Sequence, residues 1–185
     1  QPRLAKFMIP LRLYQKLGLQ SLIRKYYILK LISEDLTLME ALLPPLPSRP
    51  LSEELPEEIP AKGQEKGRVG FFLGCAMNLI FADVSRASIE NISRAGYRVI
   101  IPKEVQCCGT PNIAEGERKI YRQMARNTIE IFRDKRVDAI VTDCAACGSE
   151  LKAYKEIFHK DDRWNQKSAD FSSKVRDVSE FLDQA

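Results

Sequence analysis

The chain has 185 residues, of which 44% are hydrophobic and 29% charged, and its formal net charge at pH 7 is +4. This length accommodates one domain, or one domain with an appendage, and the composition is that of an ordinary globular protein. So mild a positive charge gives no support for nucleic acid as a partner. The first residue is Gln1 rather than Met, and we expect the chain to be a segment of a longer protein.

The cysteines are the most informative residues, and there are five of them: Cys75, Cys107, Cys108, Cys144 and Cys147. An odd number with an adjacent pair argues against a disulfide framework, because neighbouring cysteines cannot bridge without straining the peptide between them. The N-terminal region lacks a secretory signal pattern, and the longest apolar runs fall short of the roughly 20 residues that span a bilayer. We therefore expect a cytoplasmic setting, including the inner face of the membrane, where clustered cysteines usually serve metal or redox chemistry.

Residues 1–43 are predicted to form a helical connector. Apolar residues at helical spacings indicate two short helices over residues 1–33, interrupted at Pro10 and Gly18, and one more over residues 34–43. The first 33 residues hold seven Lys or Arg and no acidic residue. Two interpretations stay open: a basic amphipathic surface for an anionic membrane or a partner subunit, and a helical arm that packs on its own protein with its basic face in solvent.

Residues 44–66 are predicted to be a linker. Six prolines fall between Pro44 and Pro60, among Glu and Ser residues. Such a composition is typical of an extended, stiff segment rather than a packed element. A compact, cysteine-rich domain is therefore expected over residues 67–185.

In that domain, strand and helix patterns alternate. Short apolar runs at residues 68–74, 97–102 and 137–142 predict buried parallel strands. Helices are expected over residues 78–95, 114–134, 147–158 and 161–184. The expected buried faces of the first two helices are Phe81, Val84, Ile92 and Ala95, and Tyr121, Ala125, Thr128 and Phe132. The predicted fold class is α/β: a small parallel sheet of three to four strands flanked by helices, with an N-terminal helical extension.

All the cysteines follow the predicted strands. Cys75 comes directly after the first strand, Cys107 and Cys108 a few residues after the second, and Cys144 and Cys147 bracket the turn after the third. Sites in open parallel sheets form beyond the carboxyl ends of the strands, so the five sulfurs are expected at one edge of the sheet. Soft thiolates that converge from several loops suit an iron–sulfur cluster or zinc.

Two other interpretations explain the cysteines less well. Buried structural cysteines would be scattered along the chain instead of gathered at strand ends. A dithiol site of the thioredoxin type would use Cys144-Ala-Ala-Cys147 between a strand and a helix. That interpretation leaves the other three cysteines without a role.

The spacing Cys-x31-Cys-Cys-Gly-x34-Cys-x2-Cys-Gly resembles the cysteine-rich CCG domain found in heterodisulfide reductases and in the iron–sulfur subunits of glycolate and lactate oxidases. The proline-rich linker and the segments Gly-Arg-Val-Gly-Phe-Phe-Leu-Gly-Cys, Cys-Gly-Ser-Glu-Leu-Lys-Ala-Tyr and Val-Arg-Asp-Val-Ser-Glu-Phe-Leu narrow this resemblance to the middle of a glycolate oxidase iron–sulfur subunit. By this resemblance the chain is the first CCG repeat with its connector, without the ferredoxin-like module and second repeat of the complete subunit. Many glycolate subunits lack the first cysteine of the final pair in this repeat, whereas Cys144 is present here.

The resemblance implies a function. The chain would be an electron-transfer component of a membrane-associated glycolate or lactate oxidase complex, passing electrons from an FAD-containing hydroxy-acid oxidase subunit toward quinone or another acceptor. Its partners would be that flavoprotein, the rest of the same iron–sulfur subunit and, peripherally, the membrane. The implied cofactor is a [4Fe-4S] cluster, non-cubane as in heterodisulfide reductase, held by Cys75, Cys107, Cys108, Cys144 and Cys147. No catalytic residue and no stand-alone dehydrogenase activity are expected.

Alternatives of other classes are a catalytic thiol–disulfide reductase of the heterodisulfide reductase kind and a zinc-stabilised assembly domain. The chain has no glycine-rich phosphate loop, so nucleotide binding has no local support.

The remaining polar candidates are weak. Asp143 could tune a cluster or end a strand, Glu104 and Gln106 could hydrogen-bond around the site, His159 is expected on the surface, and Asp161-Asp162 is expected at a helix start.

Overall fold

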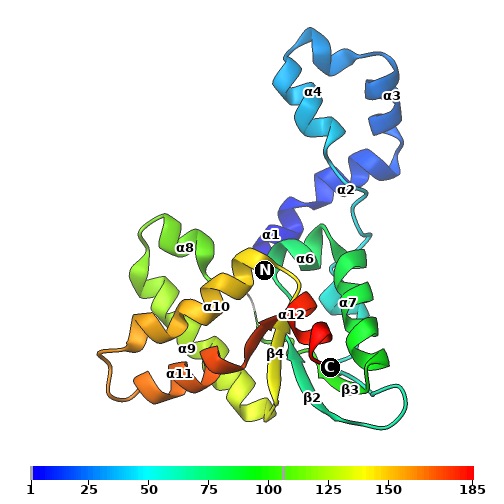
Figure 1. The fold of residues 1–185 in the computed structure, drawn as a ribbon. Coiled ribbons are helices and arrows are strands. Elements are labelled where there is room, and N and C mark those ends of the chain that lie inside the picture. The colour runs from blue at the N-terminus through cyan, green and yellow to red at the C-terminus, as the bar shows by residue number, and fades with distance from the viewer. Residues whose placement is uncertain (1, 106) are drawn as a thin grey trace.

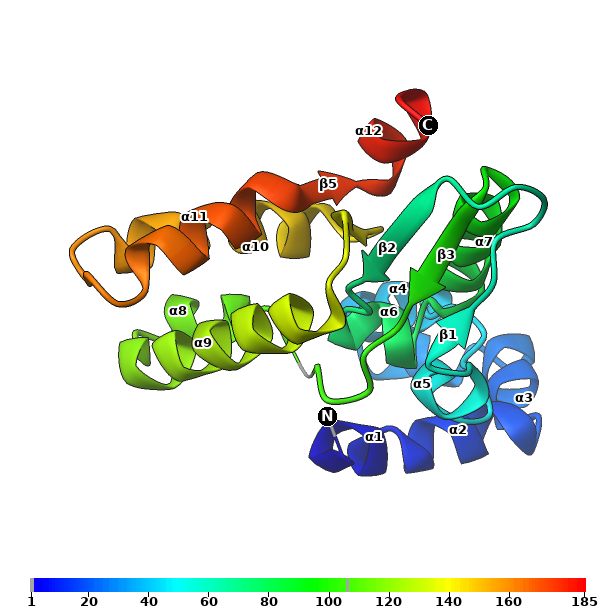
Figure 2. The ribbon, with the colours of Figure 1, turned by 90° about the horizontal axis from the view of Figure 1, so that it is seen from below.

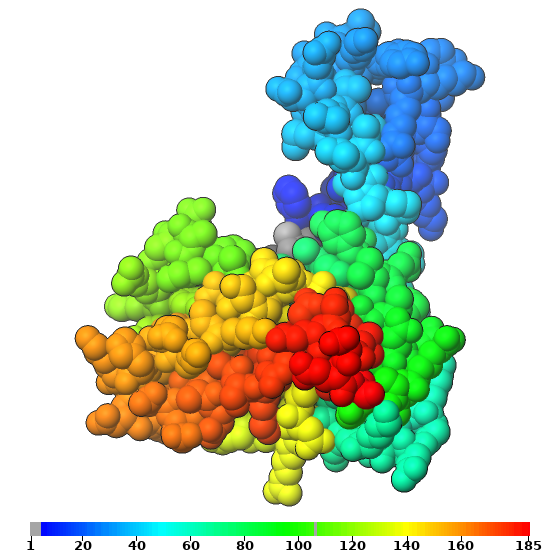
Figure 3. Space-filling view, in the orientation of Figure 1, coloured from blue at the N-terminus to red at the C-terminus, as the bar shows by residue number. Residues whose placement is uncertain are grey.

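The computed structural model describes residues 2–105 and 107–185. An α/β domain occupies the C-terminal three quarters of the chain, and a helical arm that precedes it projects to one side (Figure 1). In the space-filling view most of the arm stands clear of the domain (Figure 3).

A five-stranded sheet with the order β1-β3-β2-β4-β5 forms the centre of the domain. Three strands lie where they were predicted: β2 (Gly67–Phe71), β3 (Tyr97–Ile100) and β4 (Ala139–Thr142). β5 (Val175–Asp177) continues the parallel pairing beside β4, and β1 (Glu58–Ile59) pairs antiparallel with β3. The α/β class and the parallel core are confirmed, with five strands instead of three or four.

Helices cover both faces of the sheet, as Figure 2 shows. One face packs against α9 (Arg118–Lys135), α10 (Ala145–Phe158) and α11 (Asn165–Lys174), and the predicted buried stripe of α9 lies in this core. The other face packs against α7 (Ala82–Arg94) and α12 (Val178–Asp183). Both faces of the strands are therefore buried, which explains their continuous apolar runs.

The predicted buried face of the first helix of the domain is wrong in part. α7 begins at Ala82, and Phe81 and Val84 have exposed fractions of 44% and 50%. The helix instead buries Ala82 and Ser85 with Ile89. The small side chains of Ala82 and Ser85 let α7 pack close to the sheet. This close packing outweighs the burial that Phe81 and Val84 would gain on the same face.

The single helix predicted over residues 161–184 is also wrong, because β5 divides it. Val175 is fully buried and pairs with Ile140 of β4. Asp177 then begins α12 with a capping box, in which its carboxylate accepts the N–H of Ser179 at 2.9 Å and its own N–H donates to Glu180. Burial of Val175 in the sheet overrides the local helical pattern.

The arm consists of four short α-helices and a 3-10 turn: α1 (Pro2–Phe7), α2 (Ile9–Lys16), α3 (Leu19–Lys25), η1 (Ile28–Leu31) and α4 (Glu34–Ala41). Gly18 separates α2 from α3 with a φ of +72°, as predicted. Pro10 lies in the first turn of α2 and does not interrupt it, since N–H groups of the first turn have no partner within a helix. Among the described residues, none of the helices has both the length and the apolar character to cross a bilayer.

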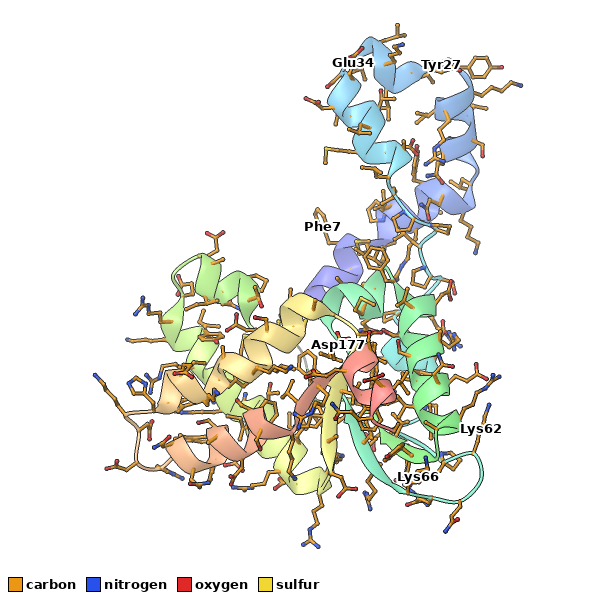
Figure 4. The ribbon with its side chains drawn as sticks, viewed as in Figure 1. Phe7, Tyr27, Glu34, Lys62, Lys66 and Asp177 are labelled. Carbon is orange, nitrogen blue, oxygen red and sulfur yellow. The ribbon has the colours of Figure 1, made fainter. Side chains whose placement is uncertain are left out.

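Polar contacts hold the arm in shape. Arg24 forms an ion pair with Glu40 at 2.9 Å, and the Tyr14 hydroxyl donates to the same carboxylate at 3.3 Å. Of residues 5–43, whose burial is described, only Met8 is buried. Phe7 near the base of the arm and Tyr27 at its far end have exposed fractions of 80% and 68% (Figure 4). Apart from Met8, no side chain of residues 5–43 is fully buried, and both interpretations of the arm stay predictions.

The linker predicted over residues 44–66 is partly packed, which corrects the expectation of an extended segment. It contains β1 and α5 (Leu51–Glu54), and Leu51 is fully buried in the same core as α7. The Ser52 N–H donates to Asn78 Oδ1 at 2.7 Å, and the Lys103 ammonium binds the carbonyls of Ser52 and Leu55. The prolines keep these elements short, but apolar residues between them can still enter the core.

Candidate functional site

Three adjacent strands bring the cysteines to the carboxyl edge of the sheet. β2 leads to Cys75, the first residue of α6 (Cys75–Leu79), and β3 leads through a loop to Cys107 and Cys108. Cys144 is the N-cap of α10, and Cys147 lies in the first turn of that helix. The structure therefore brings together the five cysteines that the sequence singled out.

The five cysteines lie near enough to influence one another electrostatically. The pKa of each of four cysteines responds to a neighbour, and the interacting pairs are Cys75 with Cys107, Cys107 with Cys108, Cys108 with Cys147, and Cys147 with Cys144. Cys108 and Cys147, in the middle of the set, are buried, and the other three are half-buried. No disulfide joins them.

The cysteines shift one another's pKa. Interaction with Cys107, and then with Cys147, lowers the pKa of Cys108, and interaction with Cys107 lowers the pKa of Cys75. The pKa of Cys107 and that of Cys147 are raised, in both cases chiefly by interaction with Cys108. Cys75 and Cys108 are thus stabilised as thiolates, the form that binds metals.

Neighbouring donors reinforce this stabilisation. The Thr110 hydroxyl lies 3.1 Å from Cys108 Sγ, and the Gly109 N–H donates to Cys107 Sγ at 3.4 Å. The backbone N–H of Ala76 lies near the Cys75 sulfur and lowers the pKa of that thiol. Donors of this kind stabilise sulfur ligands and tune the metal group that they hold.

Two glycines allow the backbone to approach the sulfurs. Gly109, the N-cap of α8 (Thr110–Ala114), has a φ of +92°, and a Cβ there would lie 2.6 Å from the Tyr121 ring. A Cβ on Gly74 would lie 3.1 Å from Cys147 Sγ. A side chain at either position would displace the site, which explains the glycines beside the cysteines in the sequence.

Sequence reasoning missed Tyr154, which contacts the cysteine turn directly. Its hydroxyl donates a hydrogen bond of 2.7 Å to the carbonyl of Cys108. The signal that could have identified it is its spacing: Tyr154 follows Cys147 by seven residues, which places both on one face of a helix. Nearby, the Tyr121 hydroxyl donates to Glu150 of the same helix.

A cavity of about 390 Å³ opens beside Cys107. Its lining includes Glu104 and Val105 of the loop and Met124, Asn127 and Ile131 of α9. Glu104, a weak candidate from the sequence, is therefore close to the site, although its carboxylate lies 3.8 Å from Lys135. Gln106 lies outside the described residues.

The other weak candidates take no part in the interactions among the cysteines. The Asp143 carboxylate accepts a hydrogen bond of 2.6 Å from Ser85 of α7, and burial raises its pKa. His159 is exposed at the end of α10 and contacts the carbonyl of Glu156. Asp161 lies next to Arg126, before α11 starts at Asn165.

The chemistry of the donor set fits an iron–sulfur cluster. Five cysteines at one edge of the sheet provide the soft thiolates that such clusters use. Among residues 2–105 and 107–185, no three Cys, His, Asp or Glu side chains converge on a site for a single ion. The Gly109 N–H and the Thr110 hydroxyl lie beside two of the cysteines, where they can stabilise sulfur ligands.

Comparisons with known proteins agree with this chemistry. Residues 69–152 match the family described as "Cysteine-rich domain" (CCG), and residues 1–43 match "Glycolate oxidase iron-sulfur subunit, linker region". No solved structure matches the chain. Residues 69–152, which hold all five cysteines, are therefore similar to the CCG type of cysteine-rich domain.

Among individual relatives, the chain is 34% identical over 182 residues to the probable glycolate oxidase iron–sulfur subunit of Bacillus subtilis, covering 98% of this chain and 41% of that protein. It is 40% identical over 108 residues to an iron–sulfur protein of Methanocaldococcus jannaschii, covering 58% and 22%. It is 30% identical over 115 residues to lactate utilization protein A of Geobacillus kaustophilus, covering 62% and 47%. The chain thus spans less than half the length of these relatives, and it pairs a linker of the glycolate oxidase iron–sulfur subunit type with a CCG domain.

Proposed function

We propose that the chain is the cluster-holding part of an electron-transfer subunit in a 2-hydroxy-acid oxidase complex, with glycolate or lactate as the substrate class. The observation that carries the proposal is that five free cysteines follow three adjacent strands at one edge of the sheet. The names of two relatives, a glycolate oxidase subunit and a lactate utilization protein, support the substrate class.

The residues in named roles are the five cysteines as ligands, with Gly109 and Thr110 as donors beside them. A bound [4Fe-4S] cluster, non-cubane in our proposal, would supply one-electron chemistry. The protein's own contribution is to hold the thiolates together, to stabilise their negative charge with N–H and O–H donors, and to shield Cys108 and Cys147 from solvent.

The partners belong to the proposal. A flavoprotein subunit would oxidise the hydroxy acid, and quinone or another acceptor would receive the electrons. The exposed basic arm would contact another part of the complex or, peripherally, the inner face of the membrane, since its apolar residues are unpacked. The chain alone is expected to show no hydroxy-acid dehydrogenase activity.

Anaerobic reconstitution with iron and sulfide, followed by metal and sulfide analysis and EPR, tests this function. We expect iron and acid-labile sulfide in equal amounts and a cluster signal on oxidation or reduction. Stoichiometric zinc without iron would contradict the proposal.

A second candidate, cluster-based reduction of a disulfide, is favoured by one observation, the cavity of about 390 Å³ beside Cys107. A cavity of this size is within the range of small-molecule sites. Reduction of a heterodisulfide by the reconstituted protein would support this candidate over simple electron relay.

A further inference from the structure

The vicinal cysteine turn is attached to α10 by a hydrogen bond. The Tyr154 hydroxyl donates to the main-chain carbonyl of Cys108 at 2.7 Å, and Cys147 lies near enough to Cys108 to lower the pKa of that thiol. Cys147, Leu151, Tyr154 and Phe158 are the buried residues that share one face of this helix. Helix α10 therefore carries Cys144 and Cys147 at its N-terminus. About two turns later it carries Tyr154, whose hydroxyl donates to the turn that contains Cys107 and Cys108.

From this arrangement we infer that Tyr154 is a positioning residue of the cysteine site, which holds the Cys107–Cys108 turn in register with Cys144 and Cys147. The hydrogen bond acts on the backbone of Cys108, so it fixes where the side chain begins and hence where its sulfur points. Neither the sequence pattern nor the relatives assign a role to this tyrosine.

Packing fixes Tyr154 itself. Its ring stacks on Phe171, with centroids 5.6 Å apart and an interplanar angle of 20°, and meets Tyr121 edge-on at 6.1 Å and 72°. The side chain is fully buried. Burial also raises the pKa of Tyr154, so the phenol stays a hydrogen-bond donor at physiological pH.

The turn has little freedom on its other side. Gly109 follows Cys108 in the left-handed region, and the Tyr121 ring occupies the space that a Cβ would need. The Thr110 hydroxyl then contacts Cys108 Sγ. The Tyr121 ring of α9 thus restricts the turn at Gly109, and the hydrogen bond from Tyr154 of α10 restricts it at the Cys108 carbonyl.

The test uses the full chain in its reduced, metal-free form. Tyr154→Phe keeps the ring and removes the hydroxyl, and the alkylation rate of Cys108 by N-ethylmaleimide is measured by peptide mass spectrometry relative to Cys144. We expect Cys108 to react about five- to tenfold faster, the factor that corresponds to one buried hydrogen bond. Thermal unfolding of each variant is followed in parallel, to show that the domain is folded at the assay temperature.

Tyr121→Phe is the matched control. It removes a buried phenol from the same aromatic cluster, but this hydroxyl donates to Glu150 and not to the cysteine turn. An unchanged Cys108 rate in Tyr154→Phe would overturn the inference. So would an equal increase in Tyr121→Phe, since the effect would then come from general loosening of the aromatic core.

A second measurement is iron bound per chain after anaerobic reconstitution, which we expect to fall in Tyr154→Phe and to stay near the unmodified level in Tyr121→Phe. This part of the inference rests on the proposed function. The alkylation assay uses metal-free protein, so it tests the role of Tyr154 even if the chain binds no cluster. A failure of the proposed function can therefore be distinguished from a failure of this inference. If the unmodified protein binds iron, equal iron content in all three proteins would show that Tyr154 does not position ligands, whereas no iron in any of them would count against the proposed function alone.

Discussion

At the scale of single residues, Gly109 has the most restricted environment in the cysteine turn. Its φ of +92° suits glycine, and a Cβ would lie 2.6 Å from the Tyr121 ring. Gly109→Ala should therefore destabilise the protein by about 2–4 kcal/mol, which combines the cost of a left-handed residue with overpacking. Chemical denaturation measures this loss.

Gly116 provides the matched control, because its φ is +80° but no atom lies within 4 Å of an added Cβ. Gly116→Ala should cost about 1–2 kcal/mol, the conformational part alone. Equal losses at the two positions would mean that Tyr121 does not press on the turn.

Cys108 is a buried cysteine of the site, and both Cys107 and Cys147 lower the pKa of its thiol. Cys108→Ser should abolish the normal cluster spectrum, because a hydroxyl is a poor ligand for iron compared with a thiolate. Absorption and EPR spectra after reconstitution measure this. Thr110→Ala, which removes only the hydroxyl beside that sulfur, should retain a cluster. An unchanged spectrum in Cys108→Ser would show that the vicinal pair is structural.

At the scale of elements, α5 and β1 belong to the packed structure although they lie among prolines. Leu51 is fully buried, and Ile59 packs against the same core. Leu51→Ala should lower the free energy of unfolding by about 2–5 kcal/mol, through lost burial and the cavity left behind. Leu42→Ala, at a position with 72% exposure, should change it by less than about 0.5 kcal/mol. A small effect at Leu51 would show that the segment is a loose linker after all.

Elements were predicted well where one local signal dominated. The three central strands read as apolar runs, and the stripe of α9 repeats at helical spacing, so both were recovered from the chain alone. α7 and the segment of β5 were misjudged because tertiary contacts decided them. Ser85 is a small, buried residue of α7 itself, and Val175 lies in the edge strand β5, which no local pattern specifies.

At the scale of the whole molecule, the net charge is concentrated in the arm. Residues 1–43 contain seven basic and three acidic residues, a balance of +4 that equals the net charge of the entire chain. The α/β domain and its linker are therefore close to neutral. Because the arm also exposes its apolar residues, it is the part of the chain best suited to an anionic surface.

Co-sedimentation with lipid vesicles tests whether the arm binds an anionic membrane surface. Vesicles with anionic lipid should bind the chain at least about tenfold better than neutral vesicles, since each basic residue near such a surface contributes about 1 kcal/mol. A chain that begins at residue 44 should lose this binding and keep its unfolding midpoint, because Met8 is the one buried residue among positions 5–43. Binding that does not depend on anionic lipid would remove the membrane contact and favour a protein partner for the arm.

The candidate site was predictable to the extent that it depends on chain order. Parallel strands must end at one edge, so cysteines that follow three successive strands have to gather there, and the spacing alone was enough to single them out. The sequence by itself therefore determined the α/β class, the five thiols and the glycines that let the backbone approach them. The tertiary structure decided that Tyr154 holds the carbonyl of Cys108, and that Leu51 enters the core while most apolar residues of the arm stay exposed. These features depend on contacts between segments far apart in the chain. The helical spacing of Cys147 and Tyr154 places both on one face of a helix, but it does not identify the distant segment that this face contacts.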